Sequence, residues 1–182
     1  MLKILTIPHK VLISPVKPVT SFDAKLKKLV VDMEETLINC VDPQGVGLAA
    51  PQVGVSSALF IVKPDPHKDT KVFVNPKILK SEPHFVSTSL DSAGGRGKKN
   101  QQLEGCLSIP RIWGPVKRAD KVLLEYQDID GTKHEQWFTK MEATIIQHEV
   151  DHLQGILFTQ RSIEQNSPLY EEKDDEFVPV KY

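Results

Sequence analysis

The segment that most constrains this chain is QHEVDHLQGILF at residues 147–158, where a glutamate directly follows the first of two histidines that are four positions apart. Residues four apart lie on one face of an α-helix, so His148 and His152 can both reach one metal ion. Glu149 is offset by about 100° around the helix axis. From there its carboxylate reaches a metal-bound water, as a general base must. The alternative is chance, because the pattern fixes only three positions.

The surroundings of the motif favour a buried helix. Thr139 and Glu142 have the spacing of a capping box, which predicts that the helix begins there. Gly155 is a typical residue just after a helix C-terminus. Apolar residues flank the motif, and polar groups on a buried helix need partners; these apolar residues are Ile145, Ile146, Leu153 and Ile156.

A catalytic metal needs a third protein ligand, and the residues offer several places to look for it. Metzincin proteases take a further histidine at the position of Phe158, and phenylalanine cannot coordinate a metal. Thermolysin-like proteases take a downstream glutamate, and Glu171 or Glu172 lies at about that distance, within an acidic segment. Cys106 is the other option, because a thiolate and two imidazoles form a set that suits Zn²⁺ or Fe²⁺. Taken alone, Cys106 is better explained as a small buried core residue than as a ligand.

Length and charge narrow the class of protein. With 182 residues and a formal net charge of −1, the chain suits a single domain and gives no electrostatic case for binding nucleic acid or a membrane. No apolar run is long enough to cross a bilayer, and the first residues do not resemble a signal peptide. Two cysteines allow at most one disulfide, and a chain of this size does not need one for stability, so a reducing, intracellular location is expected. We expect one catalytic domain over 1–170 and a loosely ordered acidic tail over 171–182.

Outside the metal motif, the sequence predicts one further helix and several strands that suit antiparallel sheets. Leucine and valine at helical spacing predict an amphipathic helix at about 23–40. Alternating apolar residues predict strands at 58–63 and 71–82. A turn at 128–131 predicts a hairpin between its two flanking segments, 121–127 and 133–138. The polar, Gly/Lys-rich segment 87–102 predicts a loop.

Three motifs together resemble a known family. GVGLAAPQ at 45–52, EGCLSIP at 104–110 and QHEVDHLQGILF at 147–158 are similar, in this order and at these separations, to the signature motifs of bacterial-type peptide deformylases. The resemblance implies an α+β fold, with antiparallel sheets packed around a central helix that carries the HExxH motif and with an N-terminal amphipathic helix. It also implies a cytoplasmic enzyme that removes the N-formyl group from the initiator methionine of newly made polypeptides and releases formate.

The same resemblance assigns roles to residues. Cys106, His148 and His152 would bind one divalent metal, Fe²⁺ in many members of the family, with Zn²⁺ or Ni²⁺ able to take its place. Glu149 would be the general base that takes the proton of a metal-bound water, which leaves a hydroxide as the nucleophile. The negative charge that develops on the formyl oxygen needs preorganised donors, and the matching groups are the side-chain amide of Gln52 and the backbone N–H of Leu107. These last two residues are therefore expected to be catalytic.

Substrate binding is expected on the first two motifs and on the motif helix. By resemblance, the backbone at Val46, Gly47 and Gly105 holds an extended peptide, and Val46 and Ile145 contribute to a pocket for the methionine side chain. Such recognition by the backbone suits a substrate that includes every nascent chain. The expected partners are N-formyl-methionine nascent peptides, with transient contact to the ribosome left open. Trp113, which follows the second motif, is left open as a candidate for the mouth of the site.

Other readings of the chain remain at this point. The loop 87–102 precedes Cys106 closely, so it is either a lid over the peptide site or a passive surface loop. A general metalloprotease that uses Glu172 is the second hypothesis for the function. A non-catalytic protein with a structural metal is the third, although such a protein has no need of Glu149. A hydrolase with a cysteine nucleophile would leave the paired histidines unexplained.

Overall fold

The computed structural model describes all residues of the chain except 43, 66, 83–102, 175 and 182. Its elements follow in this order: η1 (Lys10–Ile13), α1 (Ala24–Ile38), β1 (Gly47–Ala49), η2 (Ala50–Val53), β2 (Leu59–Val62), β3 (Lys71–Glu82), β4 (Leu103–Cys106), β5 (Ile109–Pro115), β6 (Lys121–Gln127), β7 (Lys133–Thr139), α2 (Lys140–Leu153), α3 (Phe158–Glu164), β8 (Tyr170–Lys173) and β9 (Glu176–Pro179). None of the helices in this described part is long and apolar enough to span a membrane.

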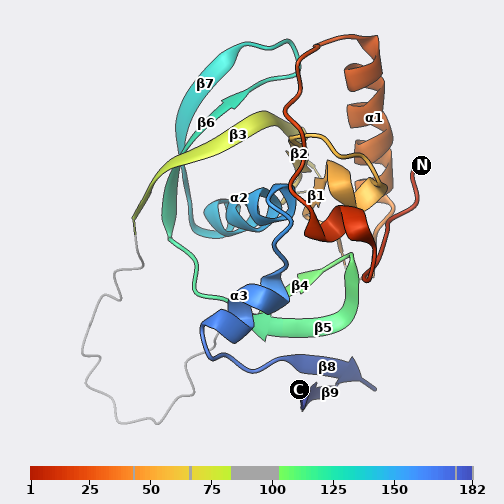
Figure 1. The fold of residues 1–182 in the computed structure, drawn as a ribbon, viewed down its shortest axis with the longest axis vertical. Coiled ribbons are helices and arrows are strands. Elements are labelled where there is room, and N and C mark those ends of the chain that lie inside the picture. Colours follow the sequence, from red (N-terminus) through yellow and green to blue (C-terminus); the bar gives the residue numbers. More distant parts are fainter. Residues whose placement is uncertain (43, 66, 83–102, 175, 182) are drawn as a thin grey trace.

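The strands form two antiparallel sheets. One has five strands in the order β1-β2-β3-β6-β7, and the other has four in the order β4-β5-β8-β9. Helix α2, which carries the metal motif, contacts β1, β2, β6 and β7 of the larger sheet, and β4 and β5 lie on its other side (Figure 1). The predicted α+β class with antiparallel sheets is confirmed.

Helix α1 forms where the sequence predicts an amphipathic helix. It begins after Asp23, whose carboxylate accepts hydrogen bonds from the backbone N–H groups of Lys25 and Leu26 and so satisfies two of the free donors at a helix start. Its apolar face is buried in a cluster that includes residues of β1 and β2. The buried residues of this face are Leu26, Val30, Met33 and Leu37.

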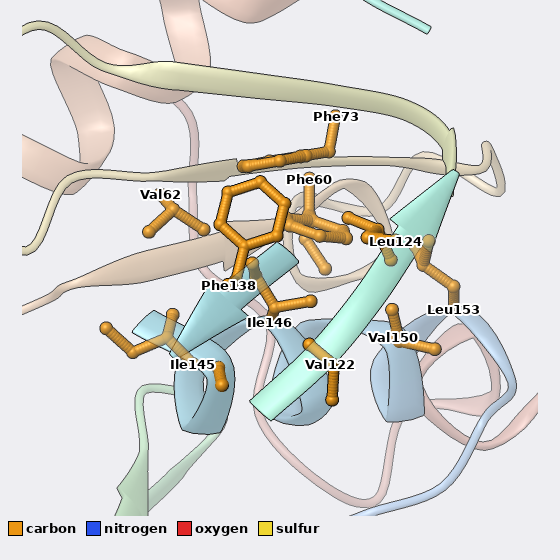
Figure 2. Packing of buried hydrophobic residues seen from close by; sticks show 12 residues of the cluster. Phe60, Val62, Phe73, Val122, Leu124, Phe138, Ile145, Ile146, Val150 and Leu153 are labelled. Atoms are coloured by element: carbon orange, nitrogen blue, oxygen red, sulfur yellow. The ribbon is translucent and has the colours of Figure 1, made fainter. Parts of the chain in front are cut away.

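Helix α2 is held on the larger sheet by a core of aromatic and branched side chains (Figure 2). The rings of Phe60 and Phe73 stack with their centroids 4.8 Å apart, and Phe138 meets Phe73 edge-on at 5.5 Å. Ile146 and Val150 of α2 belong to the same cluster. Burial of this apolar area keeps the helix in one position relative to the sheet.

The prediction for the end of α2 is confirmed, and the prediction for its start is not. Gly155 follows the helix with φ of 73°, as predicted, and a Cβ there would lie 2.6 Å from the backbone nitrogen of Ser14. The predicted capping box is wrong, because the Thr139 side chain makes no capping hydrogen bond and Glu142 pairs with Lys71 instead. Lys140, the first residue of α2, has φ of 55°, so the chain does not enter the helix in the conformation that a capping box requires.

The C-terminal segment also differs from its expectation. The sequence predicts a loosely ordered tail over 171–182, but most of the described residues there form β8 and β9, which pair with each other. Strand β8 in turn pairs with β5, with Trp113 opposite Tyr170. The acidic composition concealed this hairpin, since its backbone pairs with the edge of the sheet while many of its charged side chains face solvent. The predicted loop 87–102 lies outside the described residues.

Candidate metal centre and cleft

Two elements bring the predicted metal ligands together. Helix α2 presents His148 and His152 from one face, one turn apart, and β4 ends on Cys106 directly beside them. The candidate ligand atoms of these three residues all lie within 4.8 Å of one another, and Sγ of Cys106 is 3.2 Å from Nε2 of His152. Among the described residues this is the only group of three or more potential ligands close enough to hold a metal.

His148 is oriented by a buried ion network that the sequence did not reveal. Its Nδ1 lies 3.1 Å from Oε2 of Glu104, which leaves Nε2 as the nitrogen available to a metal. Metal-binding histidines are commonly held in this way by a carboxylate. Arg118 donates two hydrogen bonds to Glu104, at 2.9 and 3.0 Å, and a third to Asp151 at 2.6 Å. Asp151 also accepts from Arg161.

Phe158, which rules out a local third histidine, also supports the site. It is buried and its ring stacks on the imidazole of His148, with centroids 6.1 Å apart and planes inclined by 25°. The aromatic ring therefore packs beside His148 and contributes to holding its imidazole in place.

The polar atoms left over at this centre fit a bound metal and a reacting water. Oε2 of Glu149 and Nδ1 of His152 are buried and have no hydrogen-bond partner among the described residues. A buried carboxylate oxygen without a partner is costly unless a further group or a water completes the site. The thiolate and two imidazoles are a donor set that zinc and iron both accept. The residues present therefore fit one divalent metal.

The electrostatics of the protein groups differ from residue to residue. Burial raises the pKa of Glu149 to about 7, against the opposing charges of His148 and His152. Burial also opposes the ionisation of Cys106, but the charge of His152 and a hydrogen bond from His148 outweigh it and hold the thiol pKa well below its usual value. Cys106 is thus set up as a thiolate, the form that binds metals, and Glu149 has the pKa of a useful base near neutral pH.

Gln52 lies at the same centre, although it comes from the far end of the chain's first motif. Its side-chain oxygen accepts from the backbone N–H of Ala49 at 2.8 Å. This contact orients its amide nitrogen toward Sγ of Cys106, at 3.6 Å, and toward Oγ of Ser108, at 3.3 Å. Gln52 as a whole is only 2% exposed, so the direction of its amide N–H donors is fixed by its surroundings.

Gly47 explains how closely β1 approaches the motif helix. A Cβ at this position would lie 2.5 Å from Oε1 of Glu149 and 2.9 Å from Cγ2 of Ile145. Only glycine allows β1 to pass against α2 at this point. The first and third motifs are therefore in direct contact, which no spacing in the sequence could show.

A cleft of about 240 Å³ opens onto the metal-ligand group. All the predicted substrate-binding residues line it, namely Val46, Gly47, Gly105 and Ile145. The predicted catalytic residues Gln52, Leu107 and Glu149 line it too. Trp113, a candidate for the mouth of the site, is part of the lining, while the lining residues Leu103, Met141 and Thr144 were not predicted.

Other predicted residues are elsewhere. Glu172 accepts a hydrogen bond from Nε1 of Trp113 at 2.8 Å, and Glu171 pairs with Lys173. Neither carboxylate belongs to the ligand group, so the thermolysin-like arrangement is not formed. Of the residues that the sequence did not suggest, Glu104 had one available signal: it lies within the second motif, two positions before the ligand Cys106. Arg118 had none.

Comparisons with known proteins agree with this geometry. The model of the family Polypeptide deformylase matches residues 1–167. The peptide deformylase of Desulfotalea psychrophila is 38% identical over 177 residues, covering 95% of this chain and 94% of the relative. The crystal structure of the Thermotoga maritima enzyme is similar at a TM-score of 0.73 and 34% identity, covering 88% of this chain and 97% of that one. A deformylase from Synechococcus elongatus in complex with actinonin reaches 0.74 at 32% identity, covering 88% and 79%. The chain therefore belongs to the polypeptide deformylase family.

Proposed function

We propose that this protein hydrolyses the N-formyl group of the initiator methionine of new polypeptides and releases formate. The observation that carries the proposal is the convergence of Cys106, His148 and His152 with Glu149 at the end of a cleft. A deformylase from Acinetobacter baumannii, 33% identical and with a TM-score of 0.71, has Met-Ala-Ser bound. A peptide that begins with methionine on a relative supports a peptide of the same kind as the substrate here.

Sγ of Cys106 and Nε2 of both histidines would hold one divalent metal per chain. When bound, such a metal supplies Lewis-acid chemistry and makes a nucleophile available near neutral pH. We propose Fe²⁺ as the physiological ion, as in many members of the family. Zn²⁺ and Ni²⁺ would be substitutes, because imidazole and thiolate ligands suit all three ions. Glu104 would keep His148 in the orientation that binding requires.

Glu149 would move the proton. Its Oε2 has no described partner, so it is available to accept a proton from the attacking water. The pKa of about 7 suits a group that takes a proton and then delivers it to the leaving amine. Burial of the carboxylate keeps bulk water from competing for that proton.

Gln52 and Leu107 would stabilise the charge that develops on the formyl oxygen. The amide nitrogen of Gln52 points into the centre because Ala49 holds the other end of the amide. The backbone N–H of Leu107 is the neighbour of Cys106 in the chain, so both donors flank the same ligand. Removal of one such donor typically lowers the rate by about 10²–10³-fold.

The cleft would hold the peptide as an added strand. The backbone at Val46, Gly47 and Gly105 would bond the extended substrate, and Ile145 with Val46 would contact the methionine side chain. Backbone recognition does not depend on later side chains, which suits a nascent-chain substrate. We propose that residues 1–170 form the catalytic domain, that the enzyme acts in the cytoplasm, and that it meets the ribosome transiently.

The central test is formate release from formyl-Met-Ala-Ser by metal-loaded protein. Glu149→Gln should retain the metal and lose at least about 10²-fold in kcat, since general-base catalysis contributes about 10²–10⁴-fold. Glu142→Gln is the matched control, because that residue is on the same helix and pairs with Lys71 at the surface. Full activity in Glu149→Gln would refute the proposed base.

Metal analysis tests the ligand set independently of activity. Cys106→Ala should abolish tight metal binding, whereas Cys40→Ala should not change it, because Cys40 lies at the end of α1 and bonds the backbone of Thr36. Glu172→Ala should also retain the metal; loss of metal there would favour the metalloprotease hypothesis instead.

A further inference from the structure

The C-terminal hairpin is attached to a strand that lines the cleft. Strands β8 and β9 lie beyond residue 167, where the match to the family ends. Strand β8 pairs with β5, with Ile112 opposite Glu171 and Trp113 opposite Tyr170. Figure 1 shows the hairpin alongside β5, on the side away from the larger sheet. Trp113 itself lines the cleft. The hairpin, which lies outside the family match, is therefore connected to the cleft through the side chain of Trp113 on β5.

The hairpin holds the indole ring of Trp113 from two directions. Nε1 of Trp113 donates a hydrogen bond of 2.8 Å to Oε2 of Glu172 on β8. Phe177 on β9 meets the indole edge-on, with centroids 6.0 Å apart and planes inclined by 76°. Arg111 adds a third tie, because its Nε donates to the backbone oxygen of Glu172 at 2.8 Å. An indole bonded at its nitrogen and packed on its edge has one orientation.

That orientation places the ring against the β4 side of the cleft. Gly105 is the register partner of Trp113, and a Cβ on it would lie 2.7 Å from Cζ3 and 2.8 Å from Cε3 of the indole. The ring therefore packs against the side of the Gly105 Cα where a side chain would project, next to the ligand Cys106. A side chain at 105 would push the ring out of its place, so the glycine and the tryptophan belong to one arrangement.

We propose that the C-terminal hairpin, acting through Trp113, sets the selectivity of this enzyme for the residues that follow methionine in the formylated peptide. The inference rests on the proposed function. A peptide with its formyl group at the metal ligands and its backbone along Gly105 passes the indole with the next residues of its chain. The flat apolar ring favours large apolar or aromatic side chains there. Trp113 is the specificity-determining residue, and Glu172 and Phe177 are positioning residues.

The competing explanation is that these contacts only anchor the hairpin. In that case changes at Trp113 or Glu172 would affect stability and leave the relative rates for different peptides unchanged. Selectivity is a ratio of kcat/KM values for two substrates of one preparation. It is therefore insensitive to the fraction of protein that is folded or loaded with metal.

The experiment measures kcat and KM of the metal-loaded enzyme on formyl-Met-X-Ser, with X as Gly, Leu or Phe. Trp113→Ala should lower the ratio of kcat/KM for Phe over Gly by about threefold to tenfold, the value of one aromatic contact. Glu172→Leu should lower it in the same direction, and Glu172→Gln should restore it, because the amide oxygen still accepts from the indole. Glu171→Leu is the matched control on the same strand, since Glu171 pairs with the exposed Lys173, and it should change neither the ratio nor the basal activity.

An unchanged ratio in Trp113→Ala would overturn the proposal, provided that the wild-type protein releases formate. Absence of formate release from the wild type would instead refute the proposed function.

Binding supplies a readout apart from turnover. In a Trp137→Phe background, Trp113 is the only tryptophan, and its fluorescence emission should change more with Met-Phe-Ser than with Met-Gly-Ser. Equal responses would also overturn the proposal. Trp113→Phe, which keeps a ring but loses the bond to Glu172, should lower the ratio less than Trp113→Ala does, and an equal or larger loss would contradict the role of the ring.

Discussion

The two faces of helix α2 are stabilised in different ways. One face is apolar and packs on the larger sheet through Ile146, Val150 and Leu153 (Figure 2). The other face carries His148 and His152, with Asp151 in the ion network beside them. Positions 149 and 150 are adjacent in the sequence, yet one is a carboxylate whose Oε2 has no hydrogen-bond partner among the described residues and the other is a core valine.

The difference lies in how each face responds to change. Apolar packing is non-directional and roughly proportional to buried area, so it changes gradually as side chains change. The polar face depends on named partners, because a buried charge that loses its counterion keeps its desolvation cost. The core face therefore places the helix, and the ion network orients the groups that react. Substitutions that affect one face and spare the other test this division.

The largest expected effect on stability comes from the ion network. Arg118→Leu would leave Glu104 and Asp151 without their shared guanidinium. Loss of one partner from a buried pair typically lowers the free energy of unfolding by about 3–5 kcal/mol. Urea unfolding of the metal-free protein would measure the effect.

Arg161→Leu is the control for that prediction. Arg161 bonds the same Asp151, but its side chain is 32% exposed where that of Arg118 is 8% exposed. Its removal should cost much less, because solvent can replace the lost contact. Equal losses in the two variants would mean that burial does not decide the strength of this network.

Substitutions of two adjacent isoleucines, one on each face of α2, give the next largest expected effect. Ile146 is fully buried in the core, and Ile146→Ala should lower the free energy of unfolding by about 2–5 kcal/mol with little effect on KM. Ile145 lines the cleft and contacts the position of Gly47, so Ile145→Ala should raise KM for formyl-Met peptides. Denaturant unfolding and steady-state kinetics of both variants would show whether the two effects separate. The division would fail if Ile146→Ala raised KM more than Ile145→Ala did.

The sequence allowed more of the catalytic centre to be predicted than of its support. The metal ligands, Glu149 and Gln52 lie in three short sequence motifs that could be recognised locally, and the structure brings these motifs together. Their exact roles stay predictions. Arg118 was not found, because an arginine that pairs with residues 14 and 33 positions away leaves no local pattern.

The elements followed the same rule. Helix α1 and the β6–β7 hairpin have strong local periodicity and were predicted close to their observed bounds. The C-terminal hairpin was missed because its pairing partner, β5, lies more than fifty residues earlier, as in the pair of Trp113 and Tyr170, and its composition is that of a solvated tail. Local signals predict elements, and long-range pairing decides which ambiguous segments become strands.

A pH-dependent effect sharpens the comparison at the polar face. Burial opposes the ionisation of Glu104, but hydrogen bonds from His148 and Arg118 outweigh it and lower the pKa of this carboxyl below 4.5. Since the folded pKa lies below the unfolded value, the stabilisation is present above pH 4.5 and is lost as the pH falls through the folded pKa. Glu104→Gln removes this dependence.

Thermal unfolding of the metal-free wild type and Glu104→Gln between pH 6.5 and 3.5, a range of about three units around the ordinary glutamate pKa, measures the contribution. The difference in melting temperature between the two proteins should be largest above pH 4.5 and should shrink below it. A difference that stayed constant with pH would show that the carboxylate stabilises by packing alone.

The smallest expected effect is at the start of α2, which belongs to neither face. Thr139→Ala would cost about 1 kcal/mol if the predicted capping box existed. Because the Thr139 side chain makes no capping bond, the loss should stay within about 0.5 kcal/mol, the usual range for surface changes. Glu142→Gln should lower the free energy of unfolding by an equally small amount. That loss should become smaller with added salt, since Glu142 forms a surface pair with Lys71. Additivity of the two changes in urea unfolding separates the alternatives, because residues joined in a capping box would couple and residues with separate partners would not.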